Sequence, residues 1–291
     1  MVERDVELTG LNSYCVSARA DLCLFPENDD DLLEVIQRFP SPIPNILGFG
    51  TNVILRSKTY EAPIIVLSGL NRWIKRVGSN LLHVGAGARL GAVVEYANRA
   101  GLAGLQSLAG VPGSTGGAIR MNAGAYGQCI GERVRSVTTL DSITGNYKQW
   151  DKASAKFSYR NSVFSDPGAI ITDALIELEG NNIDNPWKIE ELRRESLAVL
   201  AKRATRIPYG LPNAGSVFKR CEGCSPVGEL IEQLGLKGYR INDAMVSYQH
   251  AGIFVNSGFA TGDDIINLIA DVTSKVHNRF GVTLEQEQVI L

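Results

Sequence analysis

Residues 108–127 read LAGVPGSTGGAIRMNAGAYG, and this glycine- and alanine-rich stretch decides how the fold is interpreted. It lacks the Gly-Lys-Ser/Thr ending of a P-loop, so it does not indicate an ATP or GTP site. Small residues instead let main-chain N–H groups approach a pyrophosphate closely without a lysine. By itself, the stretch fits either such a backbone cradle or a tightly packed turn in a core of small side chains.

A second glycine-rich run covers residues 85–91, GAGARLG, between a predicted strand and a predicted helix. Its spacing is G-x-G-x-x-x-G, which differs from the G-x-G-x-x-G fingerprint of dinucleotide-binding folds. We therefore interpret these residues as turn glycines.

Strand and helix patterns alternate along the chain. Short apolar runs that end in glycine predict strands, and apolar residues at helical spacing predict helices. Thr261 can cap a long helix with Asp264 at its third position and Gly281 beyond its end. The predicted strands are residues 46–47, 64–67, 81–84, 134–140, 169–178, 252–256 and 284–291. One predicted helix begins at Asn28, and the others cover residues 90–100, 189–204, 226–234 and 261–280.

Composition limits the classes of protein to which the chain can belong. The 291 residues are 44% hydrophobic and 21% charged, which is enough for a sizeable core and suggests about two domains, with residues 207–212 (IPYGLP) as the linker. A formal charge of −2 and the absence of a basic block argue against a nucleic-acid partner. Because no apolar run is long enough to span a bilayer and no signal-peptide pattern opens the chain, we expect a cytoplasmic protein with no membrane association.

The five cysteines are odd in number and sparse, which fits a reducing compartment better than a disulfide framework. Cys221 and Cys224 form a C-x-x-C pair, which can ligate zinc or shuttle electrons. A structural zinc needs four ligands, and His250 is the only attractive candidate nearby in the sequence. We therefore expect no metal site and a pair of free thiols.

Several short motifs, taken together in order, resemble one enzyme family. Residues 48–52 (GFGTN), 112–118 (PGSTGGA) and 121–127 (MNAGAYG) closely resemble UDP-N-acetylenolpyruvoylglucosamine reductases. Further matching blocks follow in the family's order at residues 159–164 (YRNSVF), 214–219 (AGSVFK), 236–241 (LKGYRI) and 284–287 (LEQE). Such ordered blocks are far more specific than any single one. The resemblance spans roughly Asn12 to Leu291 and is to the subtype without an extra tyrosine-bearing insertion.

The resemblance implies an α+β fold: a two-subdomain FAD-binding module of the vanillyl-alcohol-oxidase (PCMH) type, followed by a smaller α+β substrate domain. The implied boundaries are 1–68 and 69–204 for the two FAD-binding subdomains, and 205–291 for the substrate-binding domain. The motif matches place FAD contacts at Gly48, Gly50, Thr51, Asn52, Pro112, Gly113, Ser114, Gly116, Gly117, Asn122 and Gly124.

The resemblance also gives three polar residues catalytic roles. Ser216 is implied to be the proton donor, although a serine in such a context is more often a turn hydroxyl or helix cap. Arg160 is implied to stabilise developing negative charge, although it would otherwise be an ordinary surface ion-pair partner. Glu287 is implied to assist from the C-terminal strand, where a solvated edge charge is the simpler interpretation.

The motifs around these residues leave some points open. Glu285 and Glu287 share one face of the predicted strand, and only the motif alignment selects Glu287. The family usually has a hydrophobic residue after this glutamate, whereas this chain has Gln288. Lys219 is a candidate contact for the substrate's anionic groups, and Tyr209 for its diphosphate, although a turn role for Tyr209 is simpler.

The function implied by the resemblance is the reduction of UDP-N-acetylglucosamine enolpyruvate to UDP-N-acetylmuramate. NADPH would supply hydride through FAD in a ping-pong order, in cytoplasmic peptidoglycan precursor synthesis that supports cell wall biogenesis, cell shape and cell division. We expect a monomer whose partner is the UDP-sugar enolpyruvyl ether. A related oxygen-consuming flavin oxidase and a non-catalytic flavin-binding protein are the alternatives. No attachment motif favours the first, and the joint presence of Ser216, Arg160 and Glu287 argues against the second.

Overall fold

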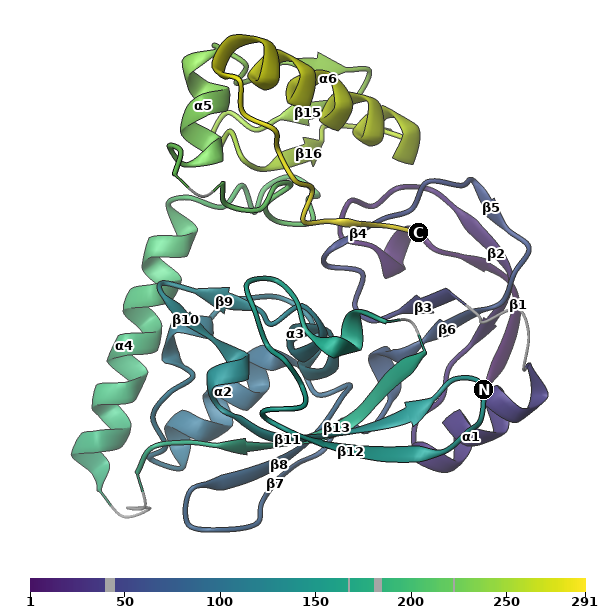
Figure 1. Cartoon of the computed structure of the whole chain (residues 1–291), viewed down its shortest axis with the longest axis vertical. Coiled ribbons are helices and arrows are strands. Elements are labelled where there is room, and N and C mark those ends of the chain that lie inside the picture. Colours follow the sequence, from purple (N-terminus) through teal and green to yellow (C-terminus); the bar gives the residue numbers. More distant parts are fainter. Residues whose placement is uncertain (40–44, 167, 181–184, 222) are drawn as a thin grey trace. The chain divides into compact units, whose positions relative to one another are not determined.

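The computed structural model describes residues 1–39, 45–166, 168–180, 185–221 and 223–291. The chain folds into two compact units of mixed helices and strands (Figure 1). Unit 1 comprises residues 1–3, 23–49 and 62–203, and unit 2 comprises residues 4–22, 50–61 and 204–291. The domain boundaries after residues 68 and 204, which the resemblance implies, differ from the bounds of these units and stay a prediction.

Unit 1 contains a five-stranded antiparallel sheet in the order β12-β11-β13-β8-β7. Buried residues alternate along its strands, as in Leu82 and Val84 or Ala174 and Ile176, because successive side chains point to opposite faces. Helix α3 packs against β8 and β13. The bounds are β7 Ile74–Arg76, β8 Leu81–Gly85, β11 Val134–Asp141, β12 Tyr147–Asp151, β13 Ala169–Glu177, α2 Leu90–Arg99 and α3 Thr115–Arg120.

A smaller group of parallel strands also belongs to unit 1. Strand β6 (Ile64–Val66) is buried throughout and pairs in parallel with β3 (Asn45–Leu47). A continuous apolar run is typical of a parallel strand covered on both faces. Helix α1 (Asp29–Arg38) begins as predicted, because the Asn28 side chain accepts a hydrogen bond from the N–H of Asp31 at 2.9 Å.

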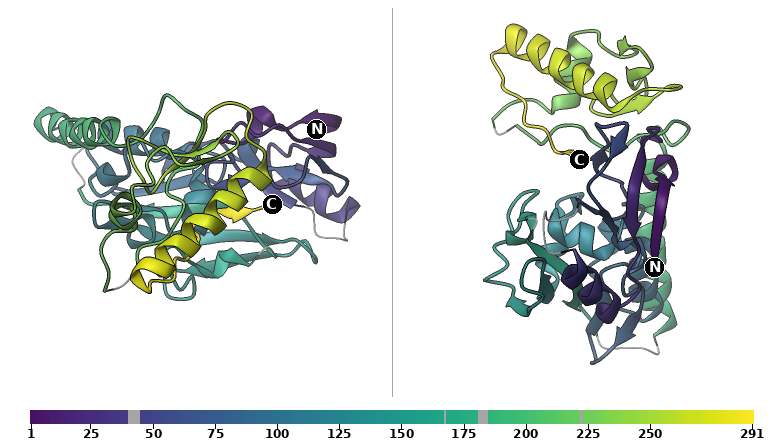
Figure 2. Two further views of the ribbon diagram at one scale, coloured as in Figure 1. Left: turned by 90° about the horizontal axis from the view of Figure 1, so that it is seen from above. Right: turned by 90° about the vertical axis from the view of Figure 1, so that its right-hand side faces the viewer.

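Unit 2 contains a three-stranded antiparallel sheet, β14-β15-β16, that contacts helix α6. Helix α6 is the long yellow helix in both views of Figure 2. Helix α6 begins with the predicted capping box of Thr261 and Asp264 and ends before Gly281, which adopts the left-handed conformation at φ 69°. The bounds are β14 Arg240–Ile241, β15 Ala244–Val246, β16 Phe254–Asn256, α5 Val227–Gln233 and α6 Gly262–Phe280.

The prediction of one continuous strand over residues 284–291 is wrong. Only β17 (Val289–Ile290) is a strand, and it pairs in parallel with β4 (Val53–Ile54). The N–H of Glu287 instead donates to Val217, whereas the N–H of Val289 donates to Asn52. Because the chain changes partner between these residues, no single ladder can form.

The remaining elements are short strands, α4 and 3-10 turns. No helix in the described ranges is long and apolar enough to cross a membrane. The bounds are β1 Val2–Glu7, β2 Arg19–Leu24, β5 Thr59–Tyr60, β9 Gly124–Ala125, β10 Gln128–Cys129 and α4 Pro186–Ala204, with 3-10 helices at Thr9–Leu11, Leu67–Gly69, Gln106–Leu108, Ile130–Glu132 and Val163–Ser165.

Candidate active site

The glycine-rich turn of unit 1 is held against the end of β8. The N–H of Thr115 donates to the carbonyl of Ala88 at 2.8 Å, and the N–H of Gly116 donates to Ala86 at 2.9 Å. A Cβ on Gly116 would lie 2.9 Å from the Cβ of Ala86, closer than side chains pack. Gly113 has φ 119°, a conformation that glycine adopts readily. Gly116 therefore serves the close packing of this turn.

The glycine-rich turn also meets the turn at Gly48. A Cβ on Gly48 would lie 3.5 Å from Ser114 Oγ, so these two predicted FAD segments are neighbours. Arg89 pairs with Ser114 through an isolated β-bridge, and its guanidinium lies 4.8 Å from the centre of the Phe49 ring. The motifs did not predict a role for Arg89. An exposed cation at the junction of two glycine turns is suited to a pyrophosphate.

Asn122 shapes the next turn of unit 1. Its side chain is buried, donates to the carbonyl of Ser158 at 2.7 Å and accepts from the N–H of Gly131 at 3.0 Å. Its backbone has φ 43°, in the left-handed region that asparagine tolerates better than most residues. Both ends of the amide are thus used within the protein, and they hold the segment that leads to Gly124.

Arg160 lies beside this same turn. Its Nη2 atom donates to the carbonyl of Gly124 at 3.0 Å, and its guanidinium lies 5.3 Å from the ring centre of Tyr159. Arg160 also has a positive φ of 53°. Its half-buried side chain is thereby held next to the predicted FAD segment 122–124 of unit 1.

The predicted FAD contacts at Gly50, Thr51 and Asn52 belong to unit 2. A Cβ on Gly50 would collide with the carbonyl oxygen of Leu11, so this position requires glycine. The side chain of Asn52 donates to the carbonyl of Glu287 at 3.1 Å. This turn therefore holds the C-terminal segment that carries a predicted catalytic residue.

Ser216 and Glu287 lie on adjacent chain segments of unit 2. The N–H of Val217 donates to Gly252 at 3.0 Å, and the N–H of Glu287 donates to the carbonyl of Val217 at 2.8 Å. Phe218 and Gln286 form the β-bridge between the two segments. Ser216 is exposed and Glu287 is half-buried. This exposure leaves the serine hydroxyl open to a substrate.

Lys219 and Glu285 form an ion pair at the outer end of these segments. Lys219 Nζ lies 2.6 Å from Glu285 Oε1, and the glutamate side chain is 73% exposed. The two candidate glutamates thus differ, because Glu285 neutralises a lysine at the surface and Glu287 is half-buried. Tyr209 is 60% exposed, within the segment that follows α4.

Comparison with known proteins identifies the family. Residues 207–291 match the family described as UDP-N-acetylenolpyruvoylglucosamine reductase, C-terminal domain, and residues 20–148 match the FAD binding domain. The UDP-N-acetylenolpyruvoylglucosamine reductase of Francisella tularensis subsp. tularensis is 34% identical, over 98% of this chain and 99% of its own length. That of Thermotoga petrophila is 39% identical, over 94% and 93%. The chain belongs to the UDP-N-acetylenolpyruvoylglucosamine reductase family.

A solved reductase structure confirms the fold of this family member. The crystal structure of UDP-N-acetylenolpyruvylglucosamine reductase (MurB) from Thermus caldophilus superimposes with a TM-score of 0.82 at 29% sequence identity, covering 100% of this chain and 98% of the other. The predicted α+β fold with an FAD-binding module is therefore confirmed, as is the prediction of an FAD-dependent oxidoreductase.

The glycine turns of unit 1 fit the FAD that this reductase family implies. Pro112 and Gly117 are exposed, and Gly113 is half-exposed. A Cβ on Gly117 would lie 3.2 Å from Ser114 Oγ, so a side chain there would crowd the surface that the bare backbone leaves open. Backbone approach and the Arg89 cation are together compatible with a dinucleotide diphosphate.

The prediction of free thiols at Cys221 and Cys224 is wrong, because the two form a disulfide in this reductase. Their Cα atoms lie 5.7 Å apart, within the range that a disulfide bridges. Gly223 between them has φ 73°, and this left-handed residue turns the chain back on itself. Cys15, Cys23 and Cys129 are free. Across the described ranges, His, Cys, Asp and Glu side chains form no metal-binding group of three or more.

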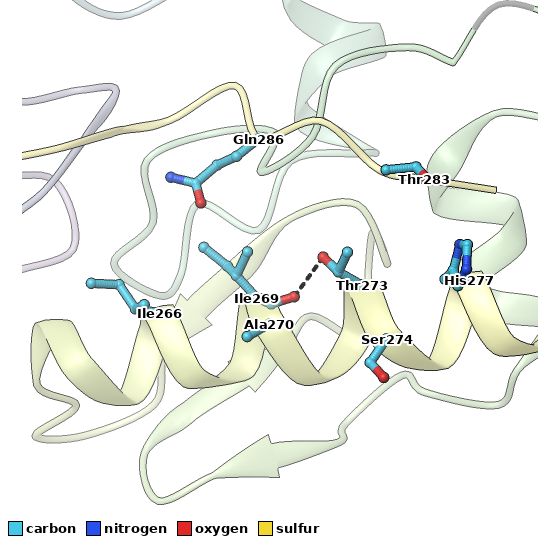
Figure 3. A pocket seen from close by; sticks show the side chains of 8 residues that line it. All are labelled: Ile266, Ile269, Ala270, Thr273, Ser274, His277, Thr283 and Gln286. Carbon is cyan, nitrogen blue, oxygen red and sulfur yellow. Dashed lines mark hydrogen bonds between the residues drawn. The ribbon is translucent and has the colours of Figure 1, made fainter.

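A mainly apolar pocket lies in unit 2 between α6 and the segment leading to β17 (Figure 3). Ile266, Ile269 and Thr273 of the helix line it, together with Gln286 of the facing segment. Thr273 Oγ1 donates to the carbonyl of Ile269 at 2.8 Å, which occupies its hydroxyl within the helix. None of the predicted catalytic or cofactor-binding residues lines this pocket.

Proposed function

We infer that this chain reduces UDP-N-acetylglucosamine enolpyruvate to UDP-N-acetylmuramate, with NADPH as the reductant and FAD as the bound cofactor. The observation that carries the inference is the similarity, over almost the whole chain, to reductases named for this substrate. The active-site motifs at Arg160, Ser216 and Glu287 support it, because they supply the polar groups that the reaction requires.

The proposed FAD contacts lie in residues 48–52 and in residues 112–124. Bound FAD supplies the redox chemistry that carries reducing equivalents from NADPH to the enolpyruvyl double bond. Gly48, Gly113 and Ser114 would hold it through their backbone, with Arg89 as the cation facing the diphosphate. Pro112, Gly116 and Gly117 would shape the turn, because the N–H groups of the two glycines already donate within the protein. Residues 50–52 and 122–124 would contribute mainly by fixing the turns, since the Asn52 and Asn122 side chains are engaged within the protein.

Ser216 is the proposed proton donor to C2 of the enolpyruvyl group. Reduction at C3 builds negative charge over C2 and the carboxylate, and this charge must be balanced by a proton and by a nearby cation. Ser216 is exposed, so its hydroxyl is available to a substrate. Arg160 is the proposed cation for the substrate carboxylate.

Glu287 is proposed to act together with Ser216, by donating a hydrogen bond to the developing enolate. A carboxyl group that donates a hydrogen bond toward a developing enolate must carry its proton. Glu287 is more shielded than Glu285, which is the glutamate in the surface ion pair with Lys219.

Lys219 is a proposed contact of the substrate's anionic groups, and Tyr209 is a proposed contact of its diphosphate. Lys219 would release the Glu285 carboxylate and bind a phosphate instead. Both groups are anions, so the lysine would keep a negatively charged partner. Tyr209 is exposed, so its ring and hydroxyl can reach a ligand. The proposed setting is a cytoplasmic monomer in peptidoglycan precursor synthesis, with consequences for cell shape and division.

The proposal is tested by steady-state turnover. Oxidation of NADPH, followed by its absorbance, should depend on added UDP-N-acetylglucosamine enolpyruvate, and the nucleotide product should be heavier by two hydrogen atoms in mass spectrometry. Rapid oxygen consumption that does not depend on NADPH would instead support the related oxidase, which takes its electrons from an organic substrate. NADPH oxidation that is indifferent to this substrate would contradict the proposed substrate.

A further inference from the structure

Gln288 is a buried polar residue directly after Glu287, at a position where hydrophobic residues are usual in the resembled family. It is 4% exposed. A buried amide is costly unless its donors and acceptor find partners. Its contacts therefore indicate why a glutamine is accommodated here.

The Gln288 amide is fully engaged within unit 2. Tyr14, which is 0% exposed, donates its hydroxyl to Gln288 Oε1 at 2.9 Å. Gln288 Nε2 donates to the carbonyls of Ala214 and Gly215 at 3.2 Å each. Because carbonyl oxygens only accept hydrogen bonds, the amide nitrogen must face them, and the orientation of the side chain is fixed.

These contacts join the two segments that carry the proposed proton-transfer residues. Ala214 and Gly215 immediately precede Ser216, and Gly215 has φ 76°, where glycine has conformational freedom. At its other end, Gln288 is covalently attached to Glu287. One side chain thus links the turn before Ser216 to the segment of Glu287.

Tyr14 is itself anchored in unit 2. Its carbonyl accepts from Asn256 Nδ2 at 2.9 Å, and the N–H of Asn256 donates to the carbonyl of Pro212 at 2.9 Å. Asn256 is buried in β16. The network therefore returns to the segment just before Ser216, so it constrains this turn from two sides.

We propose that Gln288 is a positioning residue that sets the Ser216 hydroxyl for protonation of the substrate, by holding the Ala214 and Gly215 carbonyls. This rests on the proposed roles of Ser216 and Glu287. Loss of the Gln288 donors frees the Gly215 turn without removing any group that touches the substrate. The electron transfer from NADPH should then be unaffected, whereas the step that needs Ser216 should slow.

The test compares Gln288→Met with Tyr14→Phe in the FAD-loaded protein. The first variant keeps the length of the side chain but removes both donors to the turn. The second removes one hydroxyl from the same network and leaves those donors in place, so it is the matched control for a purely structural loss. Thermal unfolding should show both variants to be less stable than wild type.

Rapid-mixing experiments without oxygen separate the two half-reactions. In Gln288→Met, flavin reduction by NADPH should proceed at the wild-type rate, and re-oxidation by the enolpyruvyl substrate should be about 10- to 100-fold slower, as for a misplaced catalytic group. Tyr14→Phe should re-oxidise at close to the wild-type rate. A wild-type rate in Gln288→Met, or an equal slowing in both variants, would overturn the proposal.

Two further variants keep the outcomes distinguishable. If Gln288→Met does not retain FAD, Gln288→Glu is of equal size and cannot donate to both carbonyls, so the same slowing is expected of it. Ser216→Ala tests the underlying role separately. Normal re-oxidation in Ser216→Ala would overturn the proposed proton donor, whereas a block there with normal re-oxidation in the Gln288 variants would overturn only the positioning role.

Discussion

The N–H of Glu287 donates to the carbonyl of Val217 at 2.8 Å, and this contact brings the C-terminal segment beside the segment of Ser216. Their shared unit also contains Gln288, whose amide contacts the turn before the serine. The proposed proton donor and the proposed glutamate are therefore held by one connected set of hydrogen bonds.

Replacement of Ser216 by alanine should separate the half-reactions. Flavin reduction by NADPH should stay at the wild-type rate, because the hydroxyl has no part in it. Re-oxidation by the enolpyruvyl substrate should fall by about 10²- to 10⁴-fold, the usual loss on removing a positioned acid. Anaerobic rapid mixing measures both rates, and an unchanged second rate would exclude Ser216 as the proton donor.

The two C-terminal glutamates should differ when each is changed to glutamine. Glu287→Gln should slow substrate-dependent re-oxidation by at least about tenfold, because an amide is a far weaker acid than a carboxyl group. Glu285→Gln is the matched control and should change the limiting rate at saturating substrate little, since Glu285 pairs with Lys219 and is not proposed to transfer a proton. The same rapid-mixing assay serves for both. Equal effects would show that the motif alignment does not select the reactive residue.

Arg89→Ala should weaken FAD binding by about tenfold, corresponding to the loss of one charge-assisted hydrogen bond of about 1.5 kcal/mol. The reason is the position of Arg89 beside Phe49 and Ser114, where the two glycine turns meet. Fluorescence titration of the apoprotein with FAD gives the dissociation constant. Arg99→Ala, at the other end of α2, removes an exposed arginine and should leave it unchanged. Equal affinity in both variants would remove Arg89 from the site.

His250 should make the stability of the protein depend on pH. Burial lowers the pKa of His250 below its ordinary value of 6.5, and its Nδ1 atom accepts from the N–H of Gly252 at 3.1 Å. The unfolded chain therefore binds a proton before the folded one does. The free energy of unfolding should fall as the pH drops below about 6.5, because the state that binds more protons is favoured.

Urea unfolding at pH 7 and pH 5 measures the effect of His250. His250→Gln should show a smaller loss of stability between these values than the wild type. His277→Gln, which changes an exposed histidine on α6, should keep the wild-type dependence. An identical loss in His250→Gln and wild type would assign the pH dependence to other groups.

Local signals in the sequence were sufficient where they act within a few residues. The capping residues Asn28 and Thr261 predicted the starts of α1 and α6, because an N-cap satisfies N–H groups only two or three positions away. The FAD-binding module was predicted in another way, through the resemblance of the motifs at residues 48–52 and 112–118 to one enzyme family, and the family comparison confirms it.

Other features depend on contacts between distant segments and were not predictable. The C-terminal strand is short because residues 287 and 289 pair with different partners. The proposed role of Arg89 in FAD binding depends on its position beside Phe49 and Ser114, which are distant in the sequence. The disulfide between Cys221 and Cys224 is local, but the odd number and sparse distribution of the cysteines indicated free thiols. The network of Tyr14 and Gln288 joins opposite ends of the chain.

The most direct measurement is the visible spectrum of the purified protein during two anaerobic additions. We expect a yellow, FAD-containing protein whose flavin absorbance is bleached by NADPH and returns on addition of UDP-N-acetylglucosamine enolpyruvate. A flavin that bleaches and does not recover with this substrate would contradict the proposed reaction. A colourless protein that cannot be loaded with FAD would contradict the assignment of the cofactor itself.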